Sequence, residues 1–383
     1  MRTKLSLAFC LATLAAVGCA VTFGPGDYIG GAADASAIDD APSTDAVVDG
    51  PGVLPDGAPT AVGRRLLVIA GEKDGADTLA NDVWVASIDA KGDLGAFEYL
   101  QPALFRGPVS RIANVAGGRL FFASRALGRS VEHVAIDAGV LVSGWQGQAV
   151  DPPPFAGYAQ VFSGSTLLAL GGGGEVPDGE GNPVYFWDDA IHLSRFTDGG
   201  FGALESSATR LPFGIQNMTV IPYKDFVYLI GGDVAAGDHR AKVLVARTDA
   251  DAGVGAFEET TRVVNPATNQ PYTPPSPVIC AGSGRMFVAG GAGTDIVLSS
   301  VIDETSGALG PWRAVTNLPG PLRAAGCAIW NDTIHLVGGI GATSRTDRII
   351  RARFAADGAL GEWELSSGER LPGPRSSIIA LTL

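Results

Sequence analysis

The chain has 383 residues, of which 46% are apolar and 17% charged, so it is long and apolar enough to bury a large core. Its formal net charge is −13, and residues 63–383 carry 25 basic and 33 acidic side chains, a net charge of −8. An acidic surface of this kind lacks the basic stripe that nucleic-acid binding requires, which excludes nucleic acid as a partner.

Residues 1–18 have the pattern of a signal peptide. Arg2 and Lys4 precede an apolar run, Leu5 to Val17, that is too short to remain as a membrane helix. The run ends in Ala16-Val17-Gly18-Cys19, which resembles the cleavage box of bacterial lipoproteins. The resemblance implies that Cys19 carries a lipid, and the absence of aspartate after it implies an outer-membrane anchor, facing the periplasm or the surface. The alternative is an ordinary secretory signal in which Cys19 has no role.

Residues 19–62 predict a disordered tether. They consist largely of Ala, Asp, Gly and Pro, contain no Lys or Arg, and cannot bury enough apolar surface to fold. Their seven aspartates repel one another: Asp27, Asp34, Asp39, Asp40, Asp45, Asp49 and Asp56.

Six short apolar runs, each ending in a pair of small residues, recur along residues 63–383 at spacings of 48 to 60 residues. Each run is too short for a helix and lacks polar alternation, which indicates a strand covered on both faces. A repeat of this length predicts propeller blades. The runs are Leu67-Val68-Ile69-Ala70-Gly71, Leu120-Phe121-Phe122-Ala123-Ser124, Leu168-Ala169-Leu170-Gly171-Gly172, Tyr228-Leu229-Ile230-Gly231-Gly232, Phe287-Val288-Ala289-Gly290-Gly291 and Leu336-Val337-Gly338-Gly339.

A glycine turn followed by an aromatic residue comes after each small pair, most clearly at 92–97, 307–312 and 358–363. It predicts a turn between two strands, with the ring packed against the next blade. Hairpin turns precede the pairs, so each unit has four strands. The first unit lacks a first strand, and 373–381 is a first strand with no second strand after it. Pairing these two ends closes the ring and predicts an all-β, six-bladed propeller.

The glycine pairs, the downstream aromatics and the sequence Leu-Pro-Gly-Pro (Leu318 to Pro321, Leu371 to Pro374) resemble kelch repeats, as in the central domain of galactose oxidase. The resemblance covers residues 63–383. The first two copies depart from the family pattern, with Ala70-Gly71 and Ala123-Ser124 in place of the glycine pair.

Two cysteines remain in the propeller, Cys280 and Cys327, in the first strands of the fifth and sixth units. Export permits a disulfide between them. Separate buried thiols are the favoured expectation, since Cys is among the most buried residue types.

Motifs for chemistry are sparse. The four histidines (His133, His192, His239 and His335) show no metal-ligand spacing, and three of them lie in strand patterns. Residues 290–298 and 178–182 resemble parts of calcium-binding motifs, but both lack the rest of the motif. We expect no metal and no cofactor.

The loops that join strands two to three and strands four to one share one side of the disc, and here they are the longer ones. This long-loop face would hold the candidate ligand-binding residues Arg111, Arg323, Arg375, Tyr185, Trp187, Arg240 and Tyr272. Arginines at the starts of first strands would clamp a carboxylate or an acidic sugar, and the aromatics would stack on sugar rings or fill a partner's pocket. The alternative is that the arginines tie blade loops together.

Two functions follow. The favoured one is a monomeric, non-catalytic envelope propeller that binds a protein or glycan and meets the membrane only through its lipid. The other is a carbohydrate-active enzyme resembling the kelch-type sialic acid epimerases, with the arginines on the substrate carboxylate. Such an enzyme needs an acid/base group, for which Glu72, Asp233 and His239 are the candidates.

Overall fold

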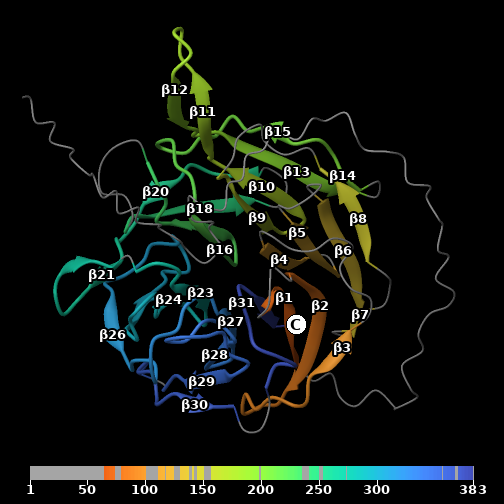
Figure 1. The fold of residues 1–383 in the computed structure, drawn as a ribbon, viewed down its shortest axis with the longest axis vertical. Helices are drawn as coiled ribbons and strands as arrows, with labels where there is room; N and C mark the ends of the chain where they lie inside the picture. The colour runs from red at the N-terminus through yellow and green to blue at the C-terminus, as the bar shows by residue number, and fades with distance from the viewer. Residues whose placement is uncertain are drawn as a thin grey trace, which may run out of the picture.

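The computed structural model describes residues 64–73, 79–100, 111–116, 118–124, 130–137, 140–141, 145–150, 157–197, 200–234, 241–249, 253–272, 274–355, 357–366 and 370–382. The predicted signal peptide, Cys19 and the tether lie outside these residues. Every regular element in the described part is a β-strand, and the strands form six blades around a central axis (Figure 1). Within the same ranges, no helix is long and apolar enough to cross a membrane.

The first three blades are antiparallel sheets, and blade 1 combines strands from the two ends of the propeller sequence. Blade 1 contains β1 (Arg64–Lys73), β2 (Leu79–Ile88), β3 (Glu98–Leu100) and the C-terminal β31 (Arg375–Ser376) and β32 (Ile379–Thr382). Blade 2 contains β4 (Arg111–Ala116), β5 (Arg119–Ser124), β6 (Ser130–Asp137), β7 (Val140–Leu141) and β8 (Gln146–Ala149). Blade 3 contains β9 (Ala159–Ser163), β10 (Thr166–Leu170), β13 (Ile191–Thr197), β14 (Gly200–Phe201) and β15 (Glu205–Ser206).

The last three blades repeat this plan, and two hairpins lie outside the blades. Blade 4 contains β16 (Thr219–Tyr223), β17 (Phe226–Ile230), β18 (Val243–Asp249), β19 (Gly253–Val254) and β20 (Glu258–Glu259). Blade 5 contains β23 (Val278–Gly282), β24 (Arg285–Ala289), β25 (Val297–Val301) and β26 (Arg313–Val315). Blade 6 contains β27 (Gly326–Trp330), β28 (Thr333–Val337), β29 (Ile349–Arg353) and β30 (Glu364–Leu365). The hairpins are β11 (Gly173–Pro177) with β12 (Pro183–Trp187), and β21 (Val264–Asn265) with β22 (Gln270–Pro271).

The C-terminal strand closes the ring, as the sequence predicts. β32 pairs antiparallel with β1, with Leu66 opposite Thr382 and Ile69 opposite Ile379. It also contacts the innermost strands of its two neighbours, β27 and β4, so the six inner strands form an unbroken circle: β4, β9, β16, β23, β27 and β32. Each inner strand therefore has an inner strand of a neighbouring blade on either side, and the ring of blades is closed.

The core consists of six hydrophobic clusters, each shared by two successive blades. In β1, Leu66 and Val68 pack toward blade 6, whereas Leu67 and Ile69 pack toward blade 2. All four side chains are fully buried. This two-sided burial explains why the apolar runs show no polar alternation.

The glycine pairs let the loop before the next blade pack against the end of the second strand. Gly338 has φ 61°, and a Cβ on it would lie 2.6 Å from the carbonyl oxygen of Arg375. The next glycine, Gly339, donates its backbone N–H to that same oxygen at 2.8 Å. Blade 1 has Ala70 in place of the first glycine, and β1 continues through a bulge to Lys73 instead of turning.

A second repeated feature lies two residues before four of the inner strands, β16, β23, β27 and β32. Asn217, Ser276, Ala324 and Ser377 have φ values of 51° to 56°, a left-handed conformation that disfavours residues other than glycine. Ser377 donates its backbone N–H to the carbonyl of Ala324 at 2.7 Å, and Ala324 donates to Ser276 at 3.1 Å. These inter-blade hydrogen bonds offset the cost of the conformation.

The aromatic rings after the glycine turns pack against the preceding blade, so the prediction of the next blade is wrong. Trp312 of blade 5 lies in the cluster shared with blade 4, and its indole N–H donates to the carbonyl of Thr261 at 3.3 Å. Trp363 of blade 6 packs on the cluster shared with blade 5 and donates to Thr316 at 2.9 Å. The direction follows from the rotation of successive blades, which a single repeat does not encode.

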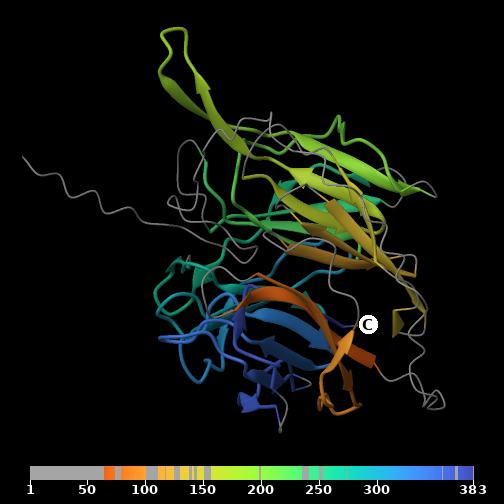
Figure 2. The ribbon, with the colours of Figure 1, turned by 45° about the vertical axis from the view of Figure 1, so that its right-hand side comes forward.

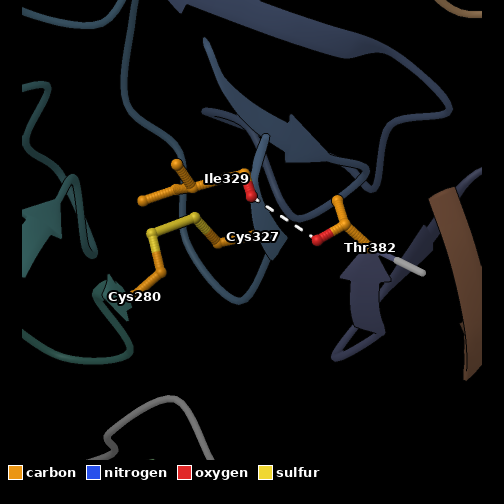
Figure 3. The surroundings of a disulfide bond; sticks show 4 residues. All are labelled: Cys280, Cys327, Ile329 and Thr382. Carbon is orange, nitrogen blue, oxygen red and sulfur yellow. Dashed lines mark hydrogen bonds between the residues drawn. A yellow bond between two sulfur atoms is a disulfide. The ribbon is translucent and has the colours of Figure 1, made fainter. Parts of the chain in front are cut away.

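Cys280 of β23 and Cys327 of β27 form a disulfide, which corrects the expectation of two separate thiols (Figure 3). Their Cα atoms are 6.1 Å apart, within the range that a disulfide spans. Both residues lie on adjacent inner strands, where the closed ring brings consecutive blades closest together. The bond covalently joins blades 5 and 6.

Removing this disulfide will destabilise the propeller. The bond closes a 47-residue loop, so Cys280→Ala/Cys327→Ala should lower the free energy of unfolding by about 2–4 kcal/mol, largely because the unfolded chain gains freedom. Urea denaturation with and without dithiothreitol measures the effect. Reductant should destabilise the wild type and leave the double variant unchanged. Equal stability of the two oxidised proteins would contradict the prediction.

Candidate functional site

The long-loop face holds the residues that the sequence offers as ligand-binding candidates, but it does not assemble them into one site. Arg240 and the acid/base candidate His239 lie outside the described residues. Arg111 begins β4, and only its backbone is described. The remaining candidates occupy four separate places: strand β31, the start of blade 6, the β11–β12 hairpin and the residue after the β21–β22 hairpin.

Arg375 is buried in the ring closure. Its side chain is 1% exposed, and its two terminal nitrogens donate to the carboxylate oxygens of Asp82 at 2.8 and 3.3 Å. Lys73 lies 3.2 Å from the same carboxylate. These cations lower the pKa of Asp82 against an opposing desolvation effect, which is the largest single contribution. The geometry favours the alternative that this arginine ties blade loops together.

Arg323 and Arg375 occupy different positions of the repeat, although both lie shortly after a Gly-Pro dipeptide. Arg375 occupies the position of Leu322, the residue whose carbonyl accepts from the preceding glycine pair. Arg323 lies one position later, forms a backbone bridge with Ile340 and is half-exposed. No side-chain partner of Arg323 is found among the described residues. Of the three arginines, it is the one whose described side chain remains accessible on the long-loop face.

Tyr272 follows the β21–β22 hairpin and has a structural role. Its hydroxyl donates to the carbonyl of Gly290 at 3.0 Å and lies 3.4 Å from Thr294 Oγ1. Burial raises its pKa. The ring is half-buried against the glycine pair of blade 5, so its hydroxyl fixes a loop of the scaffold.

The candidate acid/base residues on this face are engaged by other groups. Glu72 forms an ion pair with Arg345 at 2.9 Å. Asp233 accepts a hydrogen bond from the side-chain amide of Asn217 at 3.1 Å. In the described part of the chain, Glu72 is thus held by an arginine and Asp233 by an amide, so each of these carboxylates already has a side-chain partner.

Tyr185 and Trp187 lie on β12, in the hairpin arm that we define as residues 173–187. The arm is inserted between β10 and β13 of blade 3 and projects away from the ring (Figures 1 and 2). Tyr185 is 65% exposed, whereas Trp187 is half-buried at the base of the arm. Asp178 forms the turn at the tip, where its carboxylate accepts the backbone N–H groups of Glu180 and Asn182 at 2.8 Å each.

Sequence reasoning missed a cavity on the same face, in blade 6. It is lined by the loop before β27 and by the loop between β28 and β29, and it contains Arg345, Arg348 and Arg370. The sequence feature that could have indicated this cavity is the basic stretch from Ser344 to Arg348, in which two of five residues are arginine. No metal-binding group of His, Cys, Asp and Glu side chains occurs in the described ranges.

His335 lies inside blade 6, near blade 1, and is fully buried. Desolvation, together with the nearby Arg351 guanidinium, lowers its pKa to about 4, partly opposed by Asp93. Arg351 itself pairs with Asp93 at 2.5 Å and with Glu364 at 3.7 Å. The imidazole is therefore neutral and packed, as its strand position predicts.

No protein-family model matches the chain, and no curated protein matches it. Among solved structures, the chain is similar to the one titled "Structure of YjhT", with 15% sequence identity and a TM-score of 0.49. The similarity covers 71% of this chain and 86% of that chain.

Substituting Arg375 will reveal a structural role. Arg375→Leu should lower the free energy of unfolding by about 3 kcal/mol, because the Asp82 carboxylate loses its bidentate partner while Lys73 remains close. Urea denaturation of Arg375→Leu and of Asp82→Leu/Arg375→Leu tests this, and the double variant should recover much of the loss. Wild-type stability in Arg375→Leu would instead return this residue to the list of ligand-binding candidates.

His335 makes stability depend on pH. Its folded pKa of about 4 lies below the unfolded value of 6.5, so the unfolded state binds more protons between these values. This contribution is fully present above the unfolded pKa and is lost as the pH falls toward the folded pKa. Between pH 7 and pH 5 the loss should be about 2 kcal/mol.

Denaturation of the wild type and of His335→Leu across this pH range measures the effect. His133, whose pKa is also lowered by burial, changes stability in the same direction in both proteins, so the difference between them isolates His335. Parallel pH profiles would show that the prediction is wrong.

Proposed function

We propose that this protein is a non-catalytic, kelch-type binding propeller that engages a protein partner through its long-loop face, with the hairpin arm as the main contact. One observation carries the proposal: the arm exposes apolar side chains on both of its faces. We further propose that Cys19 is lipidated and that residues 19–62 tether a monomeric propeller to the outer membrane. Nucleic acid remains excluded by the acidic composition.

The register of the arm determines which side chains share a face. Glu175 lies opposite Tyr185, and Val176 lies opposite Val184. Since strand residues alternate between faces, Tyr185 shares one face with the two tip prolines, and the two valines share the other. Tyr185 is 65% exposed and each valine 45% exposed. Neither face is the polar, solvent-facing side expected of a simple surface hairpin.

The apolar side chains exposed on the arm are better explained by binding than by folding. A two-stranded hairpin is marginally stable alone, so exposed apolar groups along it gain little for the fold. Apolar surface that folding leaves in water is available to a partner. Tyrosine is enriched among the residues that dominate binding energy at interfaces.

The negative charge of the arm indicates the charge expected on the partner's surface. The arm contains three acidic side chains and no Lys or Arg, and two more acidic residues follow it directly: Glu175, Asp178 and Glu180, then Asp188 and Asp189. Asp189 is paired with Arg210 at 2.7 Å, whereas no ion pair joins the other four carboxylates to a basic side chain of the described residues. A complementary partner presents basic side chains around an apolar groove.

Catalysis is disfavoured by the engagement of the groups it would use. The carbohydrate-active alternative needs an arginine for the carboxylate and a nearby acid/base group. Arg375 and Glu72 are instead held by Asp82 and Arg345. The long-loop face therefore supports binding better than turnover.

Photo-crosslinking tests the proposal in cells. A photoreactive amino acid at Tyr185 should give a discrete adduct with one protein, and the same group at Leu365, which is 59% exposed on blade 6, should not. Val176→Ser should weaken adduct formation about 10-fold, since it removes about 1.4 kcal/mol of apolar contact. Raising the salt concentration should weaken the adduct as well, because the proposed partner is basic.

A matched stability measurement separates binding from folding. Replacing residues 176–184 with Gly-Asn-Gly should change the free energy of unfolding by less than about 1 kcal/mol, because the tip of the arm lies outside the blade cores. Identical adducts at positions 185 and 365, or a large loss of stability without the arm, would overturn the proposal.

A further inference from the structure

Blade 6 contains a cavity of about 450 Å³ that opens on the long-loop face, opposite the arm in the ring. Its walls are the loop at 319–322, which leads into β27, and the loop at 341–348, which joins β28 to β29. Arg370, from the loop before β31, completes the rim. This volume lies in the range of small-molecule sites.

Three arginines line the cavity of this otherwise acidic protein, and two of them are held by internal partners. Arg345 pairs with Glu72 at 2.9 Å and donates to Ser376 Oγ at 2.9 Å. Arg370 pairs with Asp347, the one acidic residue of the lining, at 3.2 Å. Arg348 is exposed, and its guanidinium has no partner among the described residues. The cavity therefore presents one uncompensated positive charge.

The rest of the lining is mixed in character. Leu322, Leu336 and Ile350 supply an apolar floor beneath the arginines. The hydroxyl-bearing Thr343 and Ser344 stand at the exposed rim. A ligand that fits has an apolar body for the floor and one anionic group for Arg348.

The wall that carries Arg348 is preorganised. Gly341 donates its backbone N–H to the carbonyl of Ser344 at 2.9 Å, and Thr346 donates to Gly339 at 2.9 Å. The Arg348 backbone N–H donates to Thr346 Oγ1 at 3.1 Å. Because these bonds fix the loop before any ligand arrives, binding would order little more than the Arg348 side chain.

We propose that this cavity binds a small organic monocarboxylate with an apolar body. The guanidinium of Arg348 takes the carboxylate in a bidentate contact, and the apolar part lies on Leu322 and Ile350. Only one guanidinium is unpaired, so one negative charge is matched and a dianion such as phosphate is not. The site is distinct from the arm on blade 3 and does not depend on the proposed protein partner.

Ligand-observed NMR and isothermal titration with 4-phenylbutyrate test the proposal on the propeller with its disulfide intact. We expect a dissociation constant of about 1 mM or tighter, a value appropriate to a ligand of this size. The neutral isostere 4-phenylbutan-1-ol should bind at least about 10-fold more weakly, since it leaves the Arg348 charge unmatched. Glucuronate and inorganic phosphate, which carry charge without an apolar body, should bind at least about 10-fold more weakly too.

Variants locate the site. Arg348→Ala should weaken 4-phenylbutyrate binding at least about 10-fold. Arg313→Ala removes an exposed arginine of β26 outside the cavity and should change binding less than about 2-fold. Ala342→Trp places a bulky ring at the exposed rim and should abolish binding, with thermal unfolding confirming that the blade remains folded.

Three results would overturn the proposal: no binding of 4-phenylbutyrate at 10-fold above the expected constant, equal affinity of wild type and Arg348→Ala, or equal binding of the acid and the alcohol. Tighter binding of glucuronate than of 4-phenylbutyrate would also overturn it, because the site would then recognise an acidic sugar and not an apolar body.

Discussion

The fold depends on one long-range interaction, the pairing of the C-terminal strand β32 with the first strand, β1. These two strands lie at opposite ends of the propeller sequence. Pairing them closes a loop that contains nearly the whole domain, which costs conformational entropy before any blade interface forms. Polar and covalent cross-links lie near this seam. Arg375 reaches Asp82, Arg345 reaches Glu72, and the disulfide joins blades 5 and 6. Apolar packing holds every blade interface. The Arg375–Asp82 pair also favours the observed register of closure, because a slipped strand would leave these buried charges unpaired.

Much of the scaffold could be predicted from the sequence, because its determinants are local and repeated. The apolar runs, glycine pairs and displaced first strand led to six blades with C-terminal closure, and both predictions are confirmed. Features set by the rotation between blades could not be derived in this way. The disulfide and the direction in which Trp312 packs both depend on how far consecutive inner strands turn around the axis.

An offset of one residue in the repeat gives Arg323 and Arg375 different structural roles. Gly-Pro-Leu-Arg before blade 6 and Gly-Pro-Arg-Ser before blade 1 look alike in sequence, yet the arginine is one position earlier in the second. In the repeat, the earlier position packs beneath the glycine pair, where Leu322 is buried, and the later one is accessible. Arg375 is tolerated there because Asp82 supplies a bidentate partner. As an arginine at the start of a first strand, Arg375 is a candidate for binding an anionic ligand. Because of its position in the repeat, it instead forms an ion pair with Asp82 inside the protein.

Several carboxylates of the long-loop face are held by arginines of the same chain. Glu72, Asp82, Asp189 and Asp347 each have an arginine partner, and the buried His335 is neutral at physiological pH. Within the described residues, this face offers an apolar, acidic arm on blade 3 and two arginines without a side-chain partner, Arg323 at the start of blade 6 and Arg348 over an apolar cavity. Both features support the proposed binding role, since each supplies contact area and fixed charge for a complementary surface.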